Sequence, residues 1–365
     1  MYILHNIRLE QMNIYIIEYL LLLISAFFIY KAGDSVNDIN KRIAVLFSIV
    51  LFLMLALRHQ SIGIDLAYRS SYGYLGSFER IGELSFVELI KLKQWQNYEP
   101  GFVFYNWLVY QLCPDRQFYM ALTAALSLFP VVYIIHKYSK NIFLAFLIYS
   151  ALPSYMMLFS GLRQGLAIGL CFYATVFIIE KKLWKFLLSV FLATQFHYSA
   201  FIFYIAYPLW HIHFSQKVCR VMIFLPPIIY IFRGFLFYVL SSLFKDNVRV
   251  EETGSFMLMV LFMMLYVYMI LFGKDQESNR PAIILFFIAC ICSIFSGLHN
   301  LANRVGFYFM PYLALCLPNM TSEISNKNEK LTMNVIFGVL FIYFALKSLN
   351  AAGMKGCSEY LFFWE

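Results

Sequence analysis

Charged residues are scarce in this chain. Of its 365 residues, 28 are Lys or Arg and 20 are Asp or Glu, so that 13% are charged against 62% hydrophobic. A soluble domain of this length would need far more charge on its surface, which excludes that class and indicates a membrane protein. No polar linker is long enough to be a second domain. The sequence therefore predicts one integral membrane domain over residues 1–365.

The signatures of several enzyme and metal sites are missing as well. There is no P-loop, GxSxG, HExxH or paired CxxC, and without a DxD pattern a cytosolic nucleotide-sugar enzyme is disfavoured. The seven cysteines mostly sit inside apolar runs, and Cys290 and Cys292 fall on different helix faces. We expect no metal and no cofactor. The net charge of +8 does not indicate nucleic acid either, because the basic residues are scattered in short loops.

Long apolar segments fill most of the chain and predict an all-α, polytopic bundle of about 10–13 transmembrane or half-spanning helices. Several segments are shorter than the roughly 20 residues of a straight crossing, so some should be half-spans. No internal repeat is visible, which mildly disfavours many transporter folds. The candidate segments are 12–30, 43–57, 118–135, 142–159, 165–179, 184–196, 199–210, 220–240, 256–272, 281–298, 305–318 and 332–348.

Lys and Arg gather in one set of short connectors, which should be cytoplasmic. These connectors hold fourteen basic residues and are 31–42, 136–140, 180–185, 211–220, 273–280 and 326–330. For all of them to share a side, the apolar dozen Phe102–Cys113 must enter the outer leaflet and return. The stretch 186–210 must also turn back near His197, where the polar run Gln195–Ser199 interrupts it.

Under this topology the opposite, outer side gathers polar residues from distant parts of the chain. An external loop, 58–101 with a re-entrant continuation to about 113, carries four of them, and the turns near 160–164, 197 and 299–304 carry the rest. We expect these side chains to converge on one water-accessible cavity. They are Arg58, Asp65, Tyr68, Glu99, Arg163, Gln164, His197 and Arg304.

Arg163 is the most informative of these residues. It is the only charged residue among the 38 positions from Ile142 to Ile179, and Gly161 and Gly165 beside it leave room for close approach. An arginine in or near a membrane needs an acid, carbonyl groups or an anionic ligand, and its planar donors suit a phosphate. The alternative is a hairpin charge lying among lipid headgroups.

The other candidates have plain structural alternatives too. Arg58 and Asp65 frame a site just above the bilayer, or else belong to an ordinary interfacial loop. Glu99 faces the cavity, or simply favours the dipole at the start of a helix. His197 orients a hydroxyl or contacts a diphosphate, or is a hydrogen-bonded packing residue. Arg304 parallels Arg163 at the outer start of an aromatic span.

Five short motifs, taken in order from about residue 40 to 320, resemble the EpsG/Wzy family of bacterial repeat-unit polymerases. At the first motif the family often has a threonine before the aspartate, where this chain has Ile64. The motifs are "LRHQSIGID" with Tyr68, "YEPGF", "LRQGLAIGL", "KKLWKFLLSVFLATQFHYSAFIF" and "NRVGFYFMPYLALCLP".

The resemblance implies a membrane glycosyltransferase at the periplasmic face of the bacterial cytoplasmic membrane, acting without a cofactor. Its substrate would be an undecaprenyl-diphosphate-linked oligosaccharide, polymerised into O-antigen, capsule or exopolysaccharide. It also implies work alongside a flippase and a chain-length regulator, among membrane lipids and without nucleic acid. Asp65, Glu99 and His197 are then the catalytic candidates. The substrate-binding candidates are Arg58, Tyr68, Arg163, Gln164 and Arg304.

Three other functions compete with this one. A flippase for lipid-linked oligosaccharides should place cations along a path from both leaflets, often with internal duplication. An O-antigen ligase shares the substrate but typically has a large late outer loop, whereas the longest candidate outer loop here is early. A membrane O-acyltransferase lacks support because its usual early cytoplasmic His and Arg features are not evident.

Overall fold

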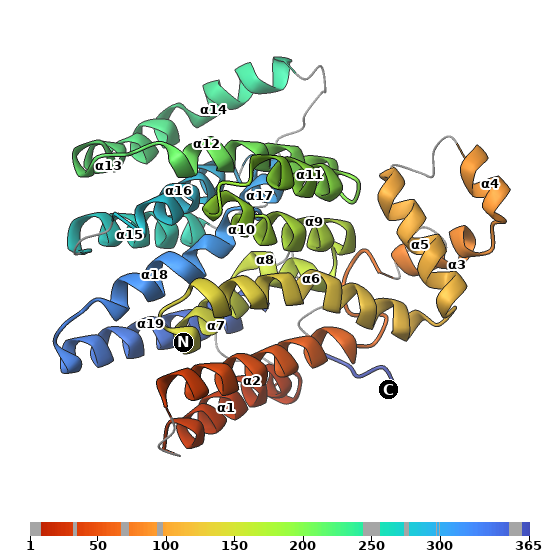
Figure 1. The fold of residues 1–365 in the computed structure, drawn as a ribbon, viewed down its shortest axis with the longest axis horizontal. Coiled ribbons are helices and arrows are strands. Elements are labelled where there is room, and N and C mark those ends of the chain that lie inside the picture. Colours follow the sequence, from red (N-terminus) through yellow and green to blue (C-terminus); the bar gives the residue numbers. More distant parts are fainter. Residues whose placement is uncertain are drawn as a thin grey trace.

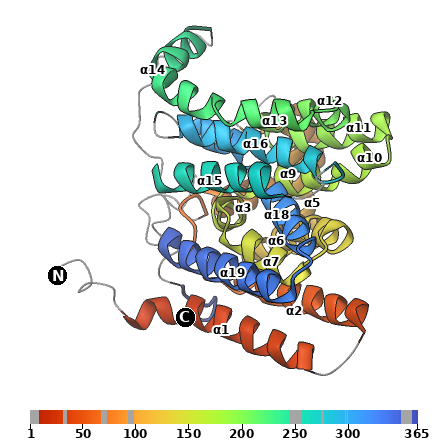
Figure 2. The ribbon, with the colours of Figure 1, turned by 90° about the vertical axis from the view of Figure 1, so that its left-hand side faces the viewer.

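The computed structural model describes residues 9–31, 35–66, 73–92, 98–243, 256–273, 277–296, 298, 300–349 and 360–365. These residues form α-helices and short 3-10 helices, and the β-pairing among them is one isolated bridge, between Arg58 and Phe362. The predicted all-α bundle is confirmed. The helices run side by side in layers (Figure 1), from α13 and α14 through α16 and α15 to α19 and α1 (Figure 2).

The helices in chain order are α1 (Leu9–Lys31), α2 (Val36–Ala56), α3 (Tyr74–Gly82), α4 (Phe86–Lys91), α5 (Pro100–Leu112), α6 (Arg116–Tyr138), α7 (Ile142–Ala151), α8 (Pro153–Met156), η1 (Met157–Phe159), α9 (Leu162–Tyr173), α10 (Thr175–Ile179), α11 (Leu183–Thr194), η2 (Tyr198–Ile205), α12 (Ala206–His211), α13 (Gln216–Met222), α14 (Leu225–Leu243), α15 (Phe256–Phe272), α16 (Arg280–Phe295), α17 (Asn300–Gly306), η3 (Met310–Tyr312), α18 (Leu313–Ser322) and α19 (Lys327–Leu349).

Five helical stretches among the described residues are long and apolar enough to cross a membrane. Two bent pairs raise the number to seven if each is one span, namely α7 with α8 and η1, and α13 with α14. Helices α11, α15 and α16 are apolar but shorter. The chain is thus a multi-pass membrane protein, and its mixture of long and short apolar helices agrees with the predicted mixture of full and half spans.

The break after α7 follows from proline chemistry. Leu152 precedes Pro153 and has an extended backbone, φ −75° and ψ 144°, because a residue before proline avoids the helical region. The chain then bends by 61° into α8 and η1. The bent segment ends at Phe159, and the turn at 160–161 then leads directly into α9.

Helix α9 packs very closely against α6. A Cβ built on Gly169 would lie 2.6 Å from the carbonyl oxygen of Ser127, so only glycine fits at this contact. A Cβ built on Gly165, one turn earlier, would lie 2.8 Å from the side chain of Leu158. The start of α9, which carries Arg163, is therefore held in a fixed position by small-residue packing.

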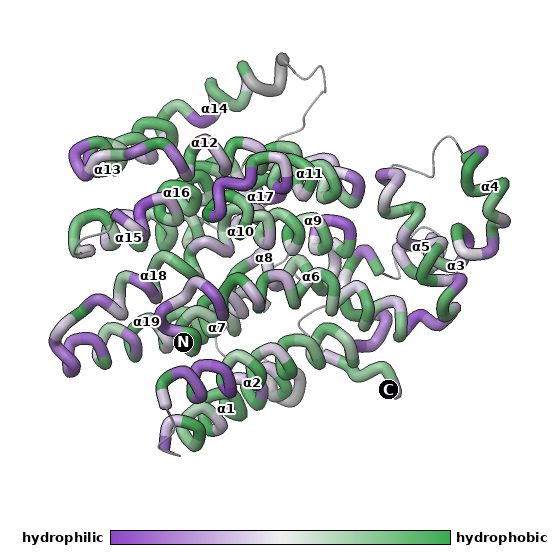
Figure 3. Tube along the Cα trace, in the orientation of Figure 1, coloured by the Kyte–Doolittle hydropathy of each residue, from purple (hydrophilic) through white to green (hydrophobic). Residues whose placement is uncertain are grey.

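Several of the basic connectors lie together at one end of the bundle. Lys137 is 3.9 Å from Glu180, and Lys140 Nζ is 2.9 Å from Glu323 Oε1. Arg280 donates to the carbonyl oxygen of Phe214 at 2.9 Å. Figure 3 shows hydrophilic stretches at this end, where α18 passes into α19 and at α13. These contacts join neighbouring connectors of the predicted set, and the side of the membrane on which the set lies stays a prediction.

The stretch 186–210 turns back at His197, as predicted. Phe186 of α11 contacts Phe203 and Tyr207 on the returning segment, with ring centroids 6.2 and 5.3 Å apart. The turn itself lies between Thr194 and Tyr198. Helix α5 begins at Pro100 and packs with α3 and α4 beside one end of the bundle (Figure 1). Its entry into the outer leaflet stays a prediction.

Candidate active site

A buried ion pair joins the start of α9 to the start of α5. Arg163 Nη1 donates to Glu99 Oε2 at 2.7 Å, and the two side chains are 17% and 3% exposed. The other carboxylate oxygen, Oε1, accepts a hydrogen bond from the backbone N–H of Tyr198 at 3.0 Å. Two of the predicted residues therefore meet directly, and Glu99 also ties them to the turn that contains His197.

Local sequence explains why Glu99 reaches this turn. Glu99 precedes α5, whose first residue is Pro100, where a missing N–H costs nothing. At Gly101 the chain comes so close to Gln195 that an added Cβ would lie 2.5 Å from the Gln195 Cβ. The N–H of Phe102 also donates to the Gln195 carbonyl at 3.0 Å. A glycine contact and a backbone hydrogen bond thus fix the position of Glu99.

Two tyrosines frame the guanidinium of Arg163. Its carbon Cζ lies 4.7 Å from the ring centroid of Tyr98 and 6.0 Å from that of Tyr74. Nε also donates to the Tyr74 hydroxyl at 3.4 Å. Burial raises the pKa of Tyr74 to about 12, so this hydroxyl is neutral at physiological pH. Cation–π contacts and one carboxylate together hold Arg163 in one orientation.

His197 is a neutral imidazole beside the ion pair. Burial, and then the charges of Arg163 and Arg304, lower the pKa of His197 to about 3. Its Nδ1 lies 3.7 Å from Glu99 Oε1, a distance that suits an ion pair only if the ring is protonated. The same Nδ1 accepts from the N–H of Ser199 at 3.3 Å. The proton is therefore on Nε2, and the ring is a hydrogen-bond donor there.

Asp65 has an exposed side chain close to these residues. We call them the Arg163 cluster, which consists of Tyr74, Tyr98, Glu99, Arg163 and His197. Its backbone N–H donates to Ser160 Oγ at 3.2 Å, which ties the 58–66 segment to the turn before α9. Gly63 has φ +110°, and an added Cβ would lie 2.0 Å from the carbonyl oxygen of Phe159. Burial is the main cause that raises the pKa values of Tyr74 and Tyr98, and the Asp65 charge adds to both. Asp65 thus lies within electrostatic reach of the tyrosines that frame Arg163.

Gln164 and Arg304 connect α9 to α17. Gln164 is buried, and its Nε2 donates to the backbone carbonyl of Arg304 at 2.6 Å. The Arg304 side chain is exposed, while its charge acts on His197 and Tyr308. Gln164 therefore holds the backbone of α17 in place, and Arg304 presents a second cation at the edge of the cluster.

Arg58 lies apart from these residues. It is fully buried, donates to the carbonyl oxygen of Leu55, and has Cζ 5.6 Å from the ring centroid of Phe159. The segment 360–365 crosses beside it and pairs with it at Phe362. The structure thus does not place Arg58 in the cluster. Tyr68, the other candidate of this loop, lies outside the described residues.

Sequence reasoning did not single out the residues that frame the pair. Tyr74, Tyr98, Ser160 and Ser199 all contact a predicted residue. Tyr98 stands next to Glu99 in "YEPGF" and so carried a signal by position, whereas Tyr74 is one of 27 tyrosines with nothing to distinguish it. Among the described residues no three His, Cys, Asp or Glu side chains lie close enough together to hold a metal ion.

Comparison with known families decides the relationship of the chain. The family model described as the EpsG family matches residues 41–362, nearly the whole chain. The chain belongs to the EpsG family. The resemblance drawn from the five motifs is thereby confirmed, and EpsG proteins are in general polysaccharide polymerases of a glycosyltransferase type. No curated protein and no solved structure matches the chain.

Proposed function

We propose that this protein joins undecaprenyl-diphosphate-linked oligosaccharide repeat units at the periplasmic face of the bacterial cytoplasmic membrane. The observation that carries the proposal is the buried Arg163–Glu99 pair at the start of two helices, with Arg304 and an exposed Asp65 close by. This arrangement holds cations at a membrane-protein surface where a charged lipid headgroup arrives. The family supports polymerase activity in general.

The proposed reaction transfers the growing glycan from its lipid diphosphate to a new lipid-linked repeat unit. The bond from the donor's anomeric carbon to the phosphate oxygen breaks, and that carbon bonds to the acceptor's hydroxyl oxygen. The hydroxyl proton passes to a base, and undecaprenyl diphosphate leaves. Negative charge develops on the leaving diphosphate, where Arg163 and Arg304 stabilise it without a nucleotide or metal.

Asp65 is the base that the geometry favours among the three candidates. Both oxygens of Glu99 already accept hydrogen bonds, from Arg163 and from the Tyr198 N–H, so its role is to position the arginine. His197 has a low pKa and Nδ1 occupied by Ser199, which leaves Nε2–H to orient a sugar hydroxyl. The Asp65 carboxylate is exposed and available to a substrate.

The polymer would be an O-antigen, a capsule or an exopolysaccharide. A flippase would deliver the repeat units and a chain-length regulator would act beside the polymerase. Gln164 would support the site by holding α17, and Tyr68 would contact the substrate from the outer loop. These roles extend the family resemblance to residues of this chain.

The lipid-linked glycans of a bacterial strain test the proposal. We expect Arg163→Ala and Arg304→Ala to lower the polymerisation rate by about 10² to 10³-fold, because each removes charge stabilisation from the leaving group. The strain should then accumulate single repeat units, measured on a glycan ladder. Arg116→Ala is the matched control, since Arg116 binds Glu79 at 2.6 Å outside the cluster.

The same ladder separates the competing functions. Loss of a flippase leaves no repeat units at the outer face, and loss of a ligase leaves polymer detached from its final acceptor. Full-length glycans from both arginine variants, at normal protein levels, would refute the assignment of Arg163 and Arg304. A ladder unchanged in a deletion strain would refute polymerase function itself.

A further inference from the structure

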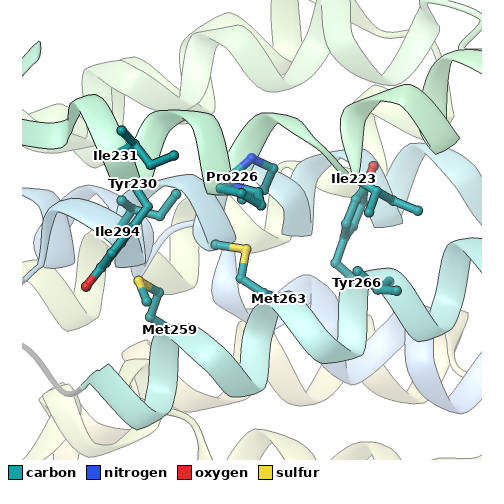
Figure 4. Close-up of a pocket in the computed structure, with 10 residues that line it drawn as sticks. Ile223, Pro226, Tyr230, Ile231, Met259, Met263, Tyr266 and Ile294 are labelled. Carbon is teal, nitrogen blue, oxygen red and sulfur yellow. The ribbon is translucent and has the colours of Figure 1, made fainter.

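An apolar groove lies between the bent pair α13–α14 and helix α15, away from the Arg163 cluster. It has a volume of about 400 Å³, within the range of sites that bind small molecules. Ile223 and Pro226 line it from one side, Met259 and Met263 from α15, and Ile294 from α16. Figure 4 shows these side chains directed toward one another across the groove.

The sequence of α13 and α14 accounts for the groove. Pro226 and Pro227 cannot donate backbone hydrogen bonds, and the two helices meet at an angle of 42° there. The bend keeps α14 from lying flat on α15. On the facing side, Met259 and Met263 have flexible thioether side chains, which adapt to an irregular apolar ligand.

One cation stands beside the groove. Arg233 of α14 has its guanidinium carbon 4.1 Å from the ring centroid of Tyr230, and Tyr230 lines the groove. Among the described residues no carboxylate lies within ion-pair distance of Arg233. Exposed apolar side chains surround it on α14, Ile231 at 73% and Phe235 at 67%. An arginine on a lipid-facing helix favours an anionic ligand.

The groove runs along α15 and reaches the end of α16 that contacts α17. Gln216 at the start of α13 donates to the Ile270 carbonyl at 2.8 Å, near the connector end. Met259 lies eleven residues before Ile270, about 16 Å along α15. Ile294 lies two residues after Cys292 on α16, and a Cβ built on Gly306 of α17 would lie 3.1 Å from the Cys292 Cβ. The groove and α17, which carries Arg304, thus share one end of α16.

We infer that this groove binds the hydrocarbon chain of a polyprenyl phosphate carrier lipid, with Arg233 contacting its phosphate. The inference rests on the proposed function, which requires carrier lipids to reach the Arg163 cluster laterally from the membrane. One groove holds one chain, which matches a polyprenyl carrier with a single chain per phosphate group. A phospholipid has two chains for each phosphate.

Binding of undecaprenyl phosphate to the purified full-length protein in nanodiscs tests the inference. Arg233→Gln should weaken that binding by about 10-fold to 100-fold, the usual loss for a hydrogen bond to a charged group. It should leave binding of undecaprenol, which has no phosphate, unchanged. Met263→Trp fills the groove and should weaken the binding of both lipids.

Two matched controls lie on the same helices. Arg220→Gln removes a cation from α13 at a residue that does not line the groove, and Met264→Trp enlarges the neighbouring side chain on α15, which is 64% exposed. Both should bind undecaprenyl phosphate like the unchanged protein. Equal affinities for Met263→Trp and Met264→Trp would overturn the inference. Displacement of undecaprenyl phosphate by an equal concentration of phosphatidylglycerol would show a general phospholipid site and overturn it too.

The binding assay and the glycan ladder fail independently. Unchanged binding in Met263→Trp, together with short glycans in Arg163→Ala, would remove the groove and leave the polymerase. Carrier binding that depends on Arg233, together with normal glycans in Arg163→Ala, would keep the groove as a carrier-lipid site and remove the assignment of the cluster.

Discussion

Two Arg–Glu pairs lie near the loop that follows α2 and differ chiefly in their surroundings. In the Arg163–Glu99 pair the closest atoms are 2.7 Å apart, and the side chains are 17% and 3% exposed. In the Arg116–Glu79 pair the closest atoms are 2.6 Å apart, and the side chains are 42% and 38% exposed. Two nitrogens of Arg116 donate to the two carboxylate oxygens of Glu79, so the contact is bidentate. By geometry alone the second pair is the stronger. Water screens it, however, and the first pair is enclosed by tyrosine rings.

The comparison shows that burial, more than distance, determines how much free energy is lost when one partner of an ion pair is removed. An exposed ion pair contributes about 0–1 kcal/mol, and many contribute nothing measurable. A buried pair gains little net stability over apolar packing, but removal of one partner is costly because the other charge stays buried. The Arg163–Glu99 pair is therefore poorly explained by stability, which favours a functional reason for keeping it.

The largest expected difference between the pairs comes from removing each acid. Glu99→Ala takes the carboxylate from Arg163 and should lower the free energy of unfolding by about 3–5 kcal/mol. Glu79→Ala should change it by about 1 kcal/mol or less. Thermal unfolding of the purified variants in detergent measures both. Similar losses in the two variants would mean that the surroundings do not distinguish the pairs.

Glycine substitution tests how the enclosed pair is positioned. Gly101→Ala would bring a Cβ within 2.9 Å of the Gln195 backbone oxygen and push α5 away from α11, at a cost of about 1–3 kcal/mol. The glycan ladder should shorten at the same time, because Glu99 moves with α5. Gly234→Ala is the control, since nothing lies within 4 Å of its added Cβ. A shortened ladder in Gly234→Ala would argue against this explanation.

The smallest expected effect is a pH response of the enclosed site. The pKa of His197 is about 3 in the folded chain, below the ordinary value near 6.5 expected in the unfolded chain. Between these pH values the unfolded chain binds a proton at His197 that the folded chain does not bind. The free energy of unfolding is therefore highest above pH 6.5 and falls as the pH decreases below that value.

Relative to His197→Gln, the unchanged protein should therefore lose about 1 kcal/mol between pH 7.5 and pH 5.5. Thermal unfolding of both proteins at the two pH values measures the difference. His59→Gln serves as a control for a histidine of the loop that follows α2. A pH response that is the same with and without His197 would contradict the enclosed, neutral ring.

Local patterns in the sequence predicted most of the helical framework and part of the site. The Pro-Gly pair after Glu99, the polar run around His197 and the lone charge at Arg163 each mark a helix end, and helix ends follow from neighbouring residues. The charge bias of the connectors adds a prediction of which helix ends face the cytoplasm. Those signals are local or compositional, so one sequence contains them.

The remaining features arise from contacts between distant segments. Arg58 was expected beside the substrate, yet residues 360–365, some 300 positions later, help to bury it. Tyr74 reaches Arg163 only because α3 packs on α5, and nothing near Tyr74 indicates that packing. The groove beside Arg233 needs three helices at once. A single sequence shows none of these pairings directly.

The contact between the loop after α2 and the last described segment also sets an order of assembly. Tyr360 donates to the Met54 carbonyl at 3.0 Å, and the N–H groups of His59 and Phe363 donate to the carbonyls of Leu361 and Leu57. A ribosome makes residues 54–59 long before residues 360–363 exist. The loop that leads to Asp65 therefore acquires this support only after the intervening helices have been made.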